Sequence, residues 1–319
     1  MEATTKPVAW KLLLAFAIIY FVWGSTFLAI RIGVREVPPF LLASIRFLIA
    51  GAALCSWTLA RGAPSPTLRE WRAAAMVAVL IFVVDYGLVF WAEQRVPSGI
   101  TAVMMAAIPV FMALSEIVIL KTQRLTLRLV AALLVGICGV AVLVSRTLSF
   151  GDAPIDPVGA GALLIAGLGW SIGSALTRKL PLPADKTVSS AAQMFAGGIL
   201  LALVAASTGE FRGFRLQAVS LKAWLALAYL IVAGSIVAYT AYVWLIHHES
   251  PTKVGTYAYV NPVVAVAVGY FFGGEAIGPR TILGTLLVLV SVVVITTAPK
   301  KTVSIPAASV EERELTTGD

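Results

Sequence analysis

The feature that most constrains this chain is a series of long apolar runs that continues over most of its length. Of its 319 residues, 59% are hydrophobic and 13% are charged, against about 45–50% and 25% in soluble domains. A membrane-spanning helix needs about 20 consecutive apolar residues, and outer-membrane barrels show alternating segments of only about 10 residues. The sequence therefore predicts an all-α integral membrane protein embedded in the lipid bilayer.

Ten apolar spans account for most of the chain. At about 20 residues each they take about 200 residues, which leaves no room for a separate soluble domain. An ABC-type pump with its own nucleotide-binding domain, a sensor kinase and a membrane-tethered hydrolase are excluded on this ground. The predicted spans are residues 10–32, 39–60, 73–92, 98–120, 127–145, 157–177, 187–207, 222–246, 253–273 and 279–298.

The distribution of positive charge predicts the orientation. The chain has 24 Lys and Arg against 16 Asp and Glu, and the positive residues lie mainly between the spans or at their ends. Fifteen of them fall on the side of the N-terminus and eight on the other, with Arg46 inside a span. The positive-inside rule then places both termini in the cytosol of a multi-pass inner (plasma) membrane protein. The charge is thereby explained without a nucleic-acid partner.

The two halves of the chain repeat each other. An offset of 147 matches the first two spans to spans six and seven, and an offset of 153 matches spans three and four to eight and nine. Six of the eight tryptophans fall into matched pairs. Recurring interfacial anchors would explain two of these pairs, but not Trp23 and Trp170, which lie deep in their spans. The matched pairs are Trp23/Trp170, Gly51/Gly198, Trp71/Trp224, Tyr86/Tyr239, Trp91/Trp244 and Pro109/Pro262.

Each repeat holds five spans, an odd number, so the second repeat must enter the membrane inverted relative to the first. We expect one repeat over residues 1–150, the second over 151–298, and a disordered polar tail over 299–319. Inverted repeats are typical of secondary transporters, whose substrate site lies at the midplane between the halves. Some channels share this plan, so the repeat alone does not exclude a pore.

Several short motifs resemble those of the EamA-type drug/metabolite transporters, over about residues 10–298. They are Trp23-Gly24-Ser25-Thr26, Arg46, Val96-Pro97-Ser98-Gly99 with Pro109, and Tyr257-Ala258-Tyr259-Val260-Asn261-Pro262 followed by Gly273-Gly274-Glu275. The resemblance implies two tandem EamA-like units, a ten-helix inner-membrane carrier, a central cavity and export of amino acids, other metabolites or drugs, usually without ATP. One departure is that Gln123 in the first unit replaces the acid that Glu275 keeps in the second.

Two ionisable residues inside the spans are functional candidates, because charges within a bilayer are costly. Arg46 and Asp85 lie at similar depths on neighbouring spans, which allows either a structural ion pair or a gate. Asp85 is the leading candidate for proton coupling, since a carboxylate titrates and an arginine does not. Arg46 is expected to pair with Asp85 or to hold a substrate carboxylate. A third ionisable residue, Glu116, is expected to reach the interface.

Polar, proline and aromatic residues near the middle of the spans form the predicted substrate path. A proline inside a helix frees a carbonyl and kinks the helix, which exposes polar backbone. Aromatic rings suit apolar or aromatic substrates, although some anchor at the interface instead. The predicted path residues are Trp23, Ser25, Tyr86, Pro109, Trp170, Ser174, Tyr239, Tyr257, Asn261 and Pro262.

Three functional hypotheses remain at this stage. The first is a secondary carrier of small molecules by alternating access. The second is a passive facilitator or channel of the same fold, favoured by Ala238, which stands where the second repeat would need a counterpart of Asp85. The third is a receptor or assembly subunit. The sequence contains no Gly-rich phosphate loop, zinc-ligand spacing or Ser/His/Asp arrangement, so we expect no enzyme, metal site or cofactor.

Overall fold

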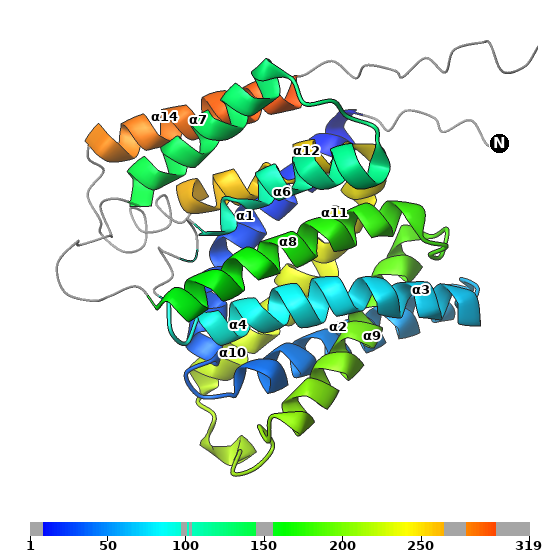
Figure 1. The fold of residues 1–319 in the computed structure, drawn as a ribbon. Helices are drawn as coiled ribbons and strands as arrows, with labels where there is room; N and C mark the ends of the chain where they lie inside the picture. The colour runs from blue at the N-terminus through cyan, green and yellow to red at the C-terminus, as the bar shows by residue number, and fades with distance from the viewer. Residues whose placement is uncertain (1–8, 97–100, 102–103, 145–155, 265–278, 298–319) are drawn as a thin grey trace, which may run out of the picture.

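The computed structural model describes residues 9–96, 101, 104–144, 156–264 and 279–297, and every regular element in these residues is a helix (Figure 1). Within the described residues, six helices are long and apolar enough to cross a membrane. Four are α1 (Ala9–Gly33), α2 (Pro39–Ala60), α8 (Pro157–Lys179) and α9 (Lys186–Ser207). The other two are composite: α3 (Leu68–Ala78) with η1 (Val79–Gly87) and α4 (Leu88–Ala92), and α10 (Leu221–Tyr229) with η4 (Leu230–Val237) and α11 (Ala238–His248).

Shorter helices complete the described fold. These are α6 (Ile108–Ser115) with η2 (Glu116–Leu120), α7 (Leu127–Val144), the 3-10 turn η3 (Leu216–Ala218), α12 (Pro251–Val254), a helical stretch over 257–264, and α14 (Pro279–Thr296). The predicted residues Pro97, Ser98, Gly99, Gly273, Gly274 and Glu275 lie outside the described residues, as does the tail 299–319.

The third span begins earlier than the hydrophobicity indicates. Its apolar run starts at Ala73, but the helix begins at Leu68 because Thr67 and Glu70 form a capping box. The Thr67 side chain accepts from the Glu70 backbone N–H, and the Glu70 carboxylate accepts from the Thr67 N–H at 2.7 Å. Reciprocal capping satisfies two orphan donors and extends the helix into a polar sequence.

Helices of the two halves pack across each other. α1 lies against α10 and α11 of the second half, and α8 lies against α3, η1 and α4 of the first. The second helices of the halves, α2 and α9, pack together, and so do the fifth helices, α7 and α14, which form a pair along one edge of the molecule (Figure 1). The hydrophobic core is therefore shared by the two halves.

The crossing of α2 and α9 depends on two glycines at matched positions. A Cβ atom on Gly51 would lie 2.5 Å from the Phe195 backbone nitrogen, and one on Gly198 would lie 2.6 Å from the Leu48 backbone nitrogen. An offset of 147 relates Leu48 to Phe195 as it relates Gly51 to Gly198, so the two contacts are reciprocal. Small residues let helix backbones approach closely in membranes.

We expect Gly51→Ala to lower the thermal stability of the purified protein, by about 1–2 kcal/mol in free energy of unfolding, because the added methyl meets backbone that cannot rotate away. Gly161→Ala is the matched control, since a Cβ at Gly161 in α8 meets nothing within 4 Å. Thermal unfolding in one detergent compares the two variants. Equal stability of Gly51→Ala and Gly161→Ala would contradict the close crossing.

Both halves contain a π-helical stretch in their third helix. η1 covers Val79–Gly87 and η4 covers Leu230–Val237, and the offset of 153 makes them overlap over six residues. In η4 the Ser235 hydroxyl donates to the Leu230 carbonyl, five residues back, at 3.0 Å. π-helical turns are rare and occur frequently at functional sites. The side chains on these two stretches are therefore candidates for the functional site.

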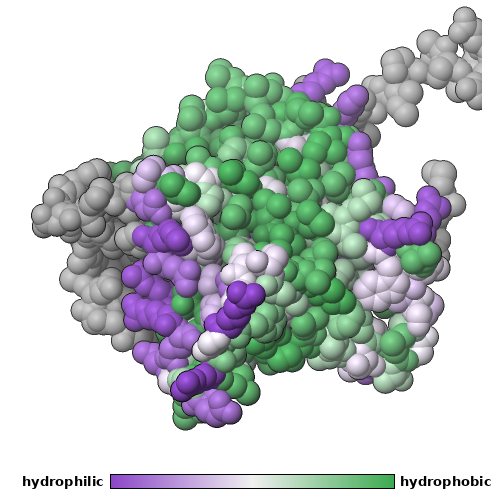
Figure 2. All heavy atoms as spheres, turned by 60° about the horizontal axis from the view of Figure 1, so that its bottom comes forward, coloured by the Kyte–Doolittle hydropathy of each residue, from purple (hydrophilic) through white to green (hydrophobic). Residues whose placement is uncertain are grey.

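The outer surface suits a bilayer. Large apolar side chains are exposed on many helices, among them Phe21, Leu134, Leu203 and Leu286. On the face in view in Figure 2, a broad hydrophobic zone separates hydrophilic groups at the two edges. The chain is therefore a membrane protein with several spanning helices and further short apolar helices.

Candidate functional site

Six aromatic side chains from both halves meet in the interior and form what we call the aromatic cluster. All are at most 8% exposed. Trp170 is central, with ring centroids 5.3 Å from Trp23, 5.7 Å from Tyr86 and 4.7 Å from Tyr242. Such separations are typical of favourable edge-to-face and tilted ring contacts. The members are Trp23, Tyr86, Trp170, Tyr239, Tyr242 and Tyr257.

The matched tryptophans Trp23 and Trp170 contact each other, but their indole N–H groups differ. Trp23 Nε1 donates to the Gly234 carbonyl at 3.1 Å. Trp170 Nε1 is buried and makes no well-formed hydrogen bond with the described residues. It lies near the hydroxyl of Tyr242, which is already hydrogen-bonded to Ser174. Among the described residues the Trp170 N–H therefore has only a poorly aligned contact with Tyr242, and it can donate to another acceptor inside the cluster.

Asp85 is buried beside the cluster, and no charged partner for it lies among the described residues. It lies on η1 and is 3% exposed, and its Oδ1 has no hydrogen-bond partner among the described residues. The carboxyl group is within electrostatic range of Tyr239, Tyr242 and Tyr257. Because a buried polar group without a partner is costly, such a group needs an explanation in terms of function or of another conformation.

Arg46 is buried on α2 and interacts with groups other than Asp85. Its Nε donates to Ser235 Oγ at 2.8 Å, which ties α2 to η4 of the other half. Its guanidinium lies 4.7 Å from the ring centroid of Phe47 and 5.0 Å from that of Tyr86. In the part of the chain that the structure describes, no ion pair joins Arg46 to Asp85. Arginine stacks readily on aromatic faces, so the rings replace an anion as its neighbours.

The second half has a neutral counterpart of this arrangement. Gln193 stands at the position that the offset of 147 assigns to Arg46, and its Oε1 accepts from the Tyr239 hydroxyl at 2.9 Å. Tyr239 is in turn the counterpart of Tyr86, which lies beside the Arg46 guanidinium. In both halves, a polar residue of the second helix therefore contacts a tyrosine of the third helix. That residue is charged in the first half (Arg46) and neutral in the second (Gln193).

The two predicted serines point in different directions. Ser174 Oγ donates to the Trp170 carbonyl and bonds the hydroxyl of Tyr242, so it supports the cluster. Ser25 bonds Tyr229 on α10 at 2.6 Å and is only partly buried. Helical spacing explains the difference, because residues four apart share a face and residues two apart do not. Ser25 follows Trp23 by two positions, whereas Ser174 follows Trp170 by four.

The predicted prolines and Asn261 are all buried. Pro109 is the second residue of α6, which begins directly after a turn at residues 106–107, as expected where a proline interrupts a helix. Pro262 lies within the helical stretch 257–264. Asn261 is 5% exposed, and its Oδ1 has no hydrogen-bond partner among the described residues. Asn261 and the cluster member Tyr257 are four residues apart on this helix and share a face.

Hydrogen bonds tie the halves together at both ends of the helices. At one end, Glu36 accepts from the Ser220 N–H and hydroxyl, at 2.6 and 2.8 Å. These bonds hold the pKa of Glu36 below its ordinary value. At the other end, Glu116 accepts from the Thr252 N–H and hydroxyl, at 3.1 and 2.7 Å. Glu116 is only 3% exposed, so it caps α12 in the interior and does not reach the interface as expected.

Sequence reasoning missed one further buried acid, Glu93. The apolar run ends at Ala92, which places Glu93 in a connecting loop, yet this side chain is 4% exposed. Burial is the main cause that raises the pKa of Glu93 to about 8, and nearby Arg31 opposes the rise. The spacing offered one weak signal: Glu93 lies four residues after Val89, which is also buried.

Comparisons with known proteins agree with this arrangement. The chain is 38% identical over 281 residues to a protein of Escherichia coli (strain K12) named "Uncharacterized inner membrane transporter YedA", covering 87% of this chain and 88% of that protein. It is 27% identical over 276 residues to "Protein PecM" of Dickeya dadantii, covering 86% and 88%. A crystal structure with 23% identity has a TM-score of 0.72 and covers 91% of this chain and 99% of its own, which shows a shared fold.

The family match covers both halves of the molecule. The EamA-like transporter family matches residues 10–145 and again residues 157–297. These two segments include all six members of the aromatic cluster, together with Arg46 and Asp85. With helices that cross the membrane and a closed polar and aromatic centre between them, the chain belongs to the EamA-like transporter family and is a membrane transporter.

Proposed function

We propose that this protein is a secondary transporter that exports small metabolites such as amino acids, or amphipathic drugs, by alternating access. The observation that carries the proposal is the aromatic cluster, which is closed to solvent and lies beside polar atoms that have no hydrogen-bond partner of good geometry among the described residues. Asp85 Oδ1, Asn261 Oδ1 and Trp170 Nε1 supply two acceptors and one donor there. Ligand sites are mostly apolar with a few well-placed polar groups, and a bound substrate would satisfy these groups.

Burial favours a carrier over a facilitator or channel of the same fold. An open pore would leave its lining side chains in contact with water, whereas every member of the aromatic cluster is at most 8% exposed. In a carrier, the two halves rock so that the centre faces one side at a time. The hydrogen bonds of Glu36 and Glu116 at opposite ends of the helices are then contacts that break in alternation.

The proposed architecture is ten spans in two inverted repeats, residues 1–150 and 151–298, with both termini in the cytosol. The reciprocal contacts of Gly51 and Gly198 and the two successive family matches support the repeat. The excess of Lys and Arg on the N-terminal side supports the orientation. The name of the Escherichia coli relative supports the inner membrane as the location.

Asp85 is the proposed proton-coupling residue, and Arg46 is a gating residue. A carboxyl group that is dry in this conformation and reaches water in another can bind a proton on one side and release it on the other. Arg46 links α2 to η4 through Ser235, so its contact must adjust whenever the halves move relative to each other.

Counterflow in proteoliposomes tests the function. Purified protein is preloaded in turn with unlabelled amino acids, nucleosides or a cationic dye, and the matching labelled compound is added outside at trace concentration. We expect a transient overshoot of label for at least one compound, because a carrier exchanges substrate across a site with alternating access. Protein-free liposomes are the control.

Equilibration without overshoot would overturn the carrier in favour of the facilitator. No uptake of label with any compound, combined with no ligand-induced thermal stabilisation, would favour a receptor or assembly subunit.

A further inference from the structure

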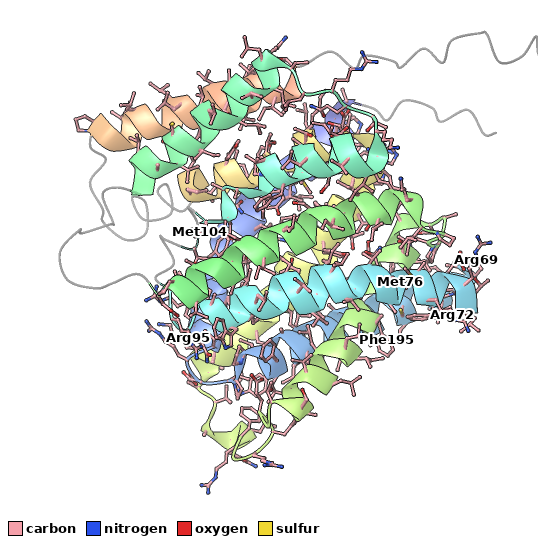
Figure 3. All side chains as sticks on the ribbon, in the orientation of Figure 1. Arg69, Arg72, Met76, Arg95, Met104 and Phe195 are labelled. Carbon is pink, nitrogen blue, oxygen red and sulfur yellow. The ribbon has the colours of Figure 1, made fainter. Side chains whose placement is uncertain are left out.

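A surface cavity lies away from the aromatic cluster, at the beginning of α3. It has a volume of about 450 Å³, within the range of about 300–1,000 Å³ that is usual for ligand sites. Figure 3 shows Arg69 and Arg72 at the N-terminal end of α3, with Met76 further along the same helix. The lining residues are Leu68, Arg69, Arg72, Ala73, Met76, Leu180 and Pro181.

The wall of the cavity is apolar and open to the surroundings. Leu68 is 68% exposed and Met76 is 56% exposed, and Leu180 and Pro181 close the other side from the end of α8. In a membrane protein such exposed side chains contact lipid. The wall therefore matches an acyl chain better than a water-soluble molecule.

The rim of the cavity is positively charged. Arg69 and Arg72 are three residues apart and lie on neighbouring parts of the helix surface, both are exposed, and neither forms an ion pair with a residue that the structure describes. The nearest acid in sequence, Glu70, accepts hydrogen bonds from Thr67 instead. The N-terminus of α3 adds the positive end of its helix dipole.

A tryptophan places this turn at the depth of the lipid headgroups. Trp71 lies between the two arginines in sequence, is half-buried and packs against Phe195 with ring centroids 6.2 Å apart. Tryptophan is enriched at the membrane–water boundary. The cavity thus combines positive charge at headgroup level with an apolar wall below it.

We propose that this cavity binds an anionic phospholipid, with the phosphate held by Arg69 and Arg72 and one acyl chain along Leu68 and Met76. Basic pockets between membrane helices on the cytoplasmic side bind anionic headgroups, and the cytosolic side is where the proposed orientation puts the start of α3. The site is separate from the transport path. A lipid bound there holds the α3 end of the first half to the bilayer.

The test uses full-length protein in neutral detergent and a fluorescent phosphatidylglycerol as the probe. We expect saturable binding that unlabelled phosphatidylglycerol displaces and phosphatidylcholine does not. The double variant Arg69→Gln/Arg72→Gln should bind about 10–30-fold more weakly, as follows from the contribution of each basic residue near an anionic surface. Met76→Trp, which fills the cavity and keeps the charges, should weaken binding as well.

The charge-matched control is Lys121→Gln/Arg124→Gln, two exposed residues after η2 on the same side. An equal loss in this control would reduce the effect to general electrostatics and overturn the site, as would unchanged binding by Met76→Trp. Displacement by inorganic phosphate as effective as by unlabelled phosphatidylglycerol would assign the site to a free anion instead. Counterflow by the same variants is measured separately, so failure of the lipid site and failure of the proposed function are distinguishable.

Discussion

Asp85→Asn is expected to abolish substrate accumulation driven by a pH gradient while leaving counterflow intact. Asparagine keeps the shape of the side chain and removes its ability to bind and release a proton. With one proton exchanged per substrate, a gradient of two pH units drives an accumulation of about 100-fold. The variant should reach a ratio of about one. Labelled substrate is followed in proteoliposomes with an acidic lumen, where an antiporter concentrates it.

Two comparisons make this result specific to Asp85. A retained counterflow overshoot shows that the variant is folded and binds substrate. Asp156→Asn is the matched control, because Asp156 caps α8 near the surface and asparagine is an equally good N-cap. Accumulation by Asp85→Asn at the level of the unchanged protein would show that coupling does not run through this carboxyl group.

Trp170→Phe is expected to raise the substrate concentration for half-maximal counterflow by about 10- to 100-fold, with a smaller loss of stability than the matched variant Trp23→Phe. Phenylalanine keeps an aromatic ring among its neighbours and removes the indole N–H, which has no well-formed hydrogen bond within the described protein. If that N–H donates to a charged group of the substrate, its loss costs about 1.5–3 kcal/mol of binding free energy. Initial counterflow rates at increasing substrate concentration measure the effect.

Trp23→Phe is the matched control for this prediction, since Trp23 is the counterpart of Trp170 in the first half. Its N–H is already used by the Gly234 carbonyl. Its removal should therefore lower the free energy of unfolding by about 1–2 kcal/mol and change the half-maximal concentration less. If the two variants lose affinity equally and Trp170→Phe is destabilised as much as Trp23→Phe, the Trp170 N–H is a structural group only.

Much of the candidate site could be predicted because the repeat is visible in the sequence. Trp23 and Trp170 match at one offset and Tyr86 and Tyr239 at another, and the structure brings all four into one cluster. Residues related by an approximate two-fold relation meet where the two halves face each other. These matched aromatic residues in the sequence therefore predict which side chains lie at the centre of the molecule.

Other features depended on helix rotation and on contacts between distant segments. Arg46 and Asp85 lie at similar depths, yet Arg46 bonds Ser235, which comes 189 positions later. Ser25 faces away from the cluster because it is two residues from Trp23, a relation that helical spacing could have revealed. Glu93 is buried although it lies beyond the end of an apolar run, and its neighbour Arg31 comes from the first helix, more than 60 positions earlier.

Hydrophobicity, residue spacing and short motifs can be read along the chain, so a helical membrane protein with two repeats and EamA-like motifs could be predicted before the fold was known. Only the folded arrangement shows that the Trp23 N–H is used and the Trp170 N–H is poorly paired, which neighbours Arg46 has, and that Asp85 has no charged partner among the described residues. Those properties arise from side chains far apart in the chain. Their meeting depends on how each helix is rotated and how deeply it packs against the opposite half.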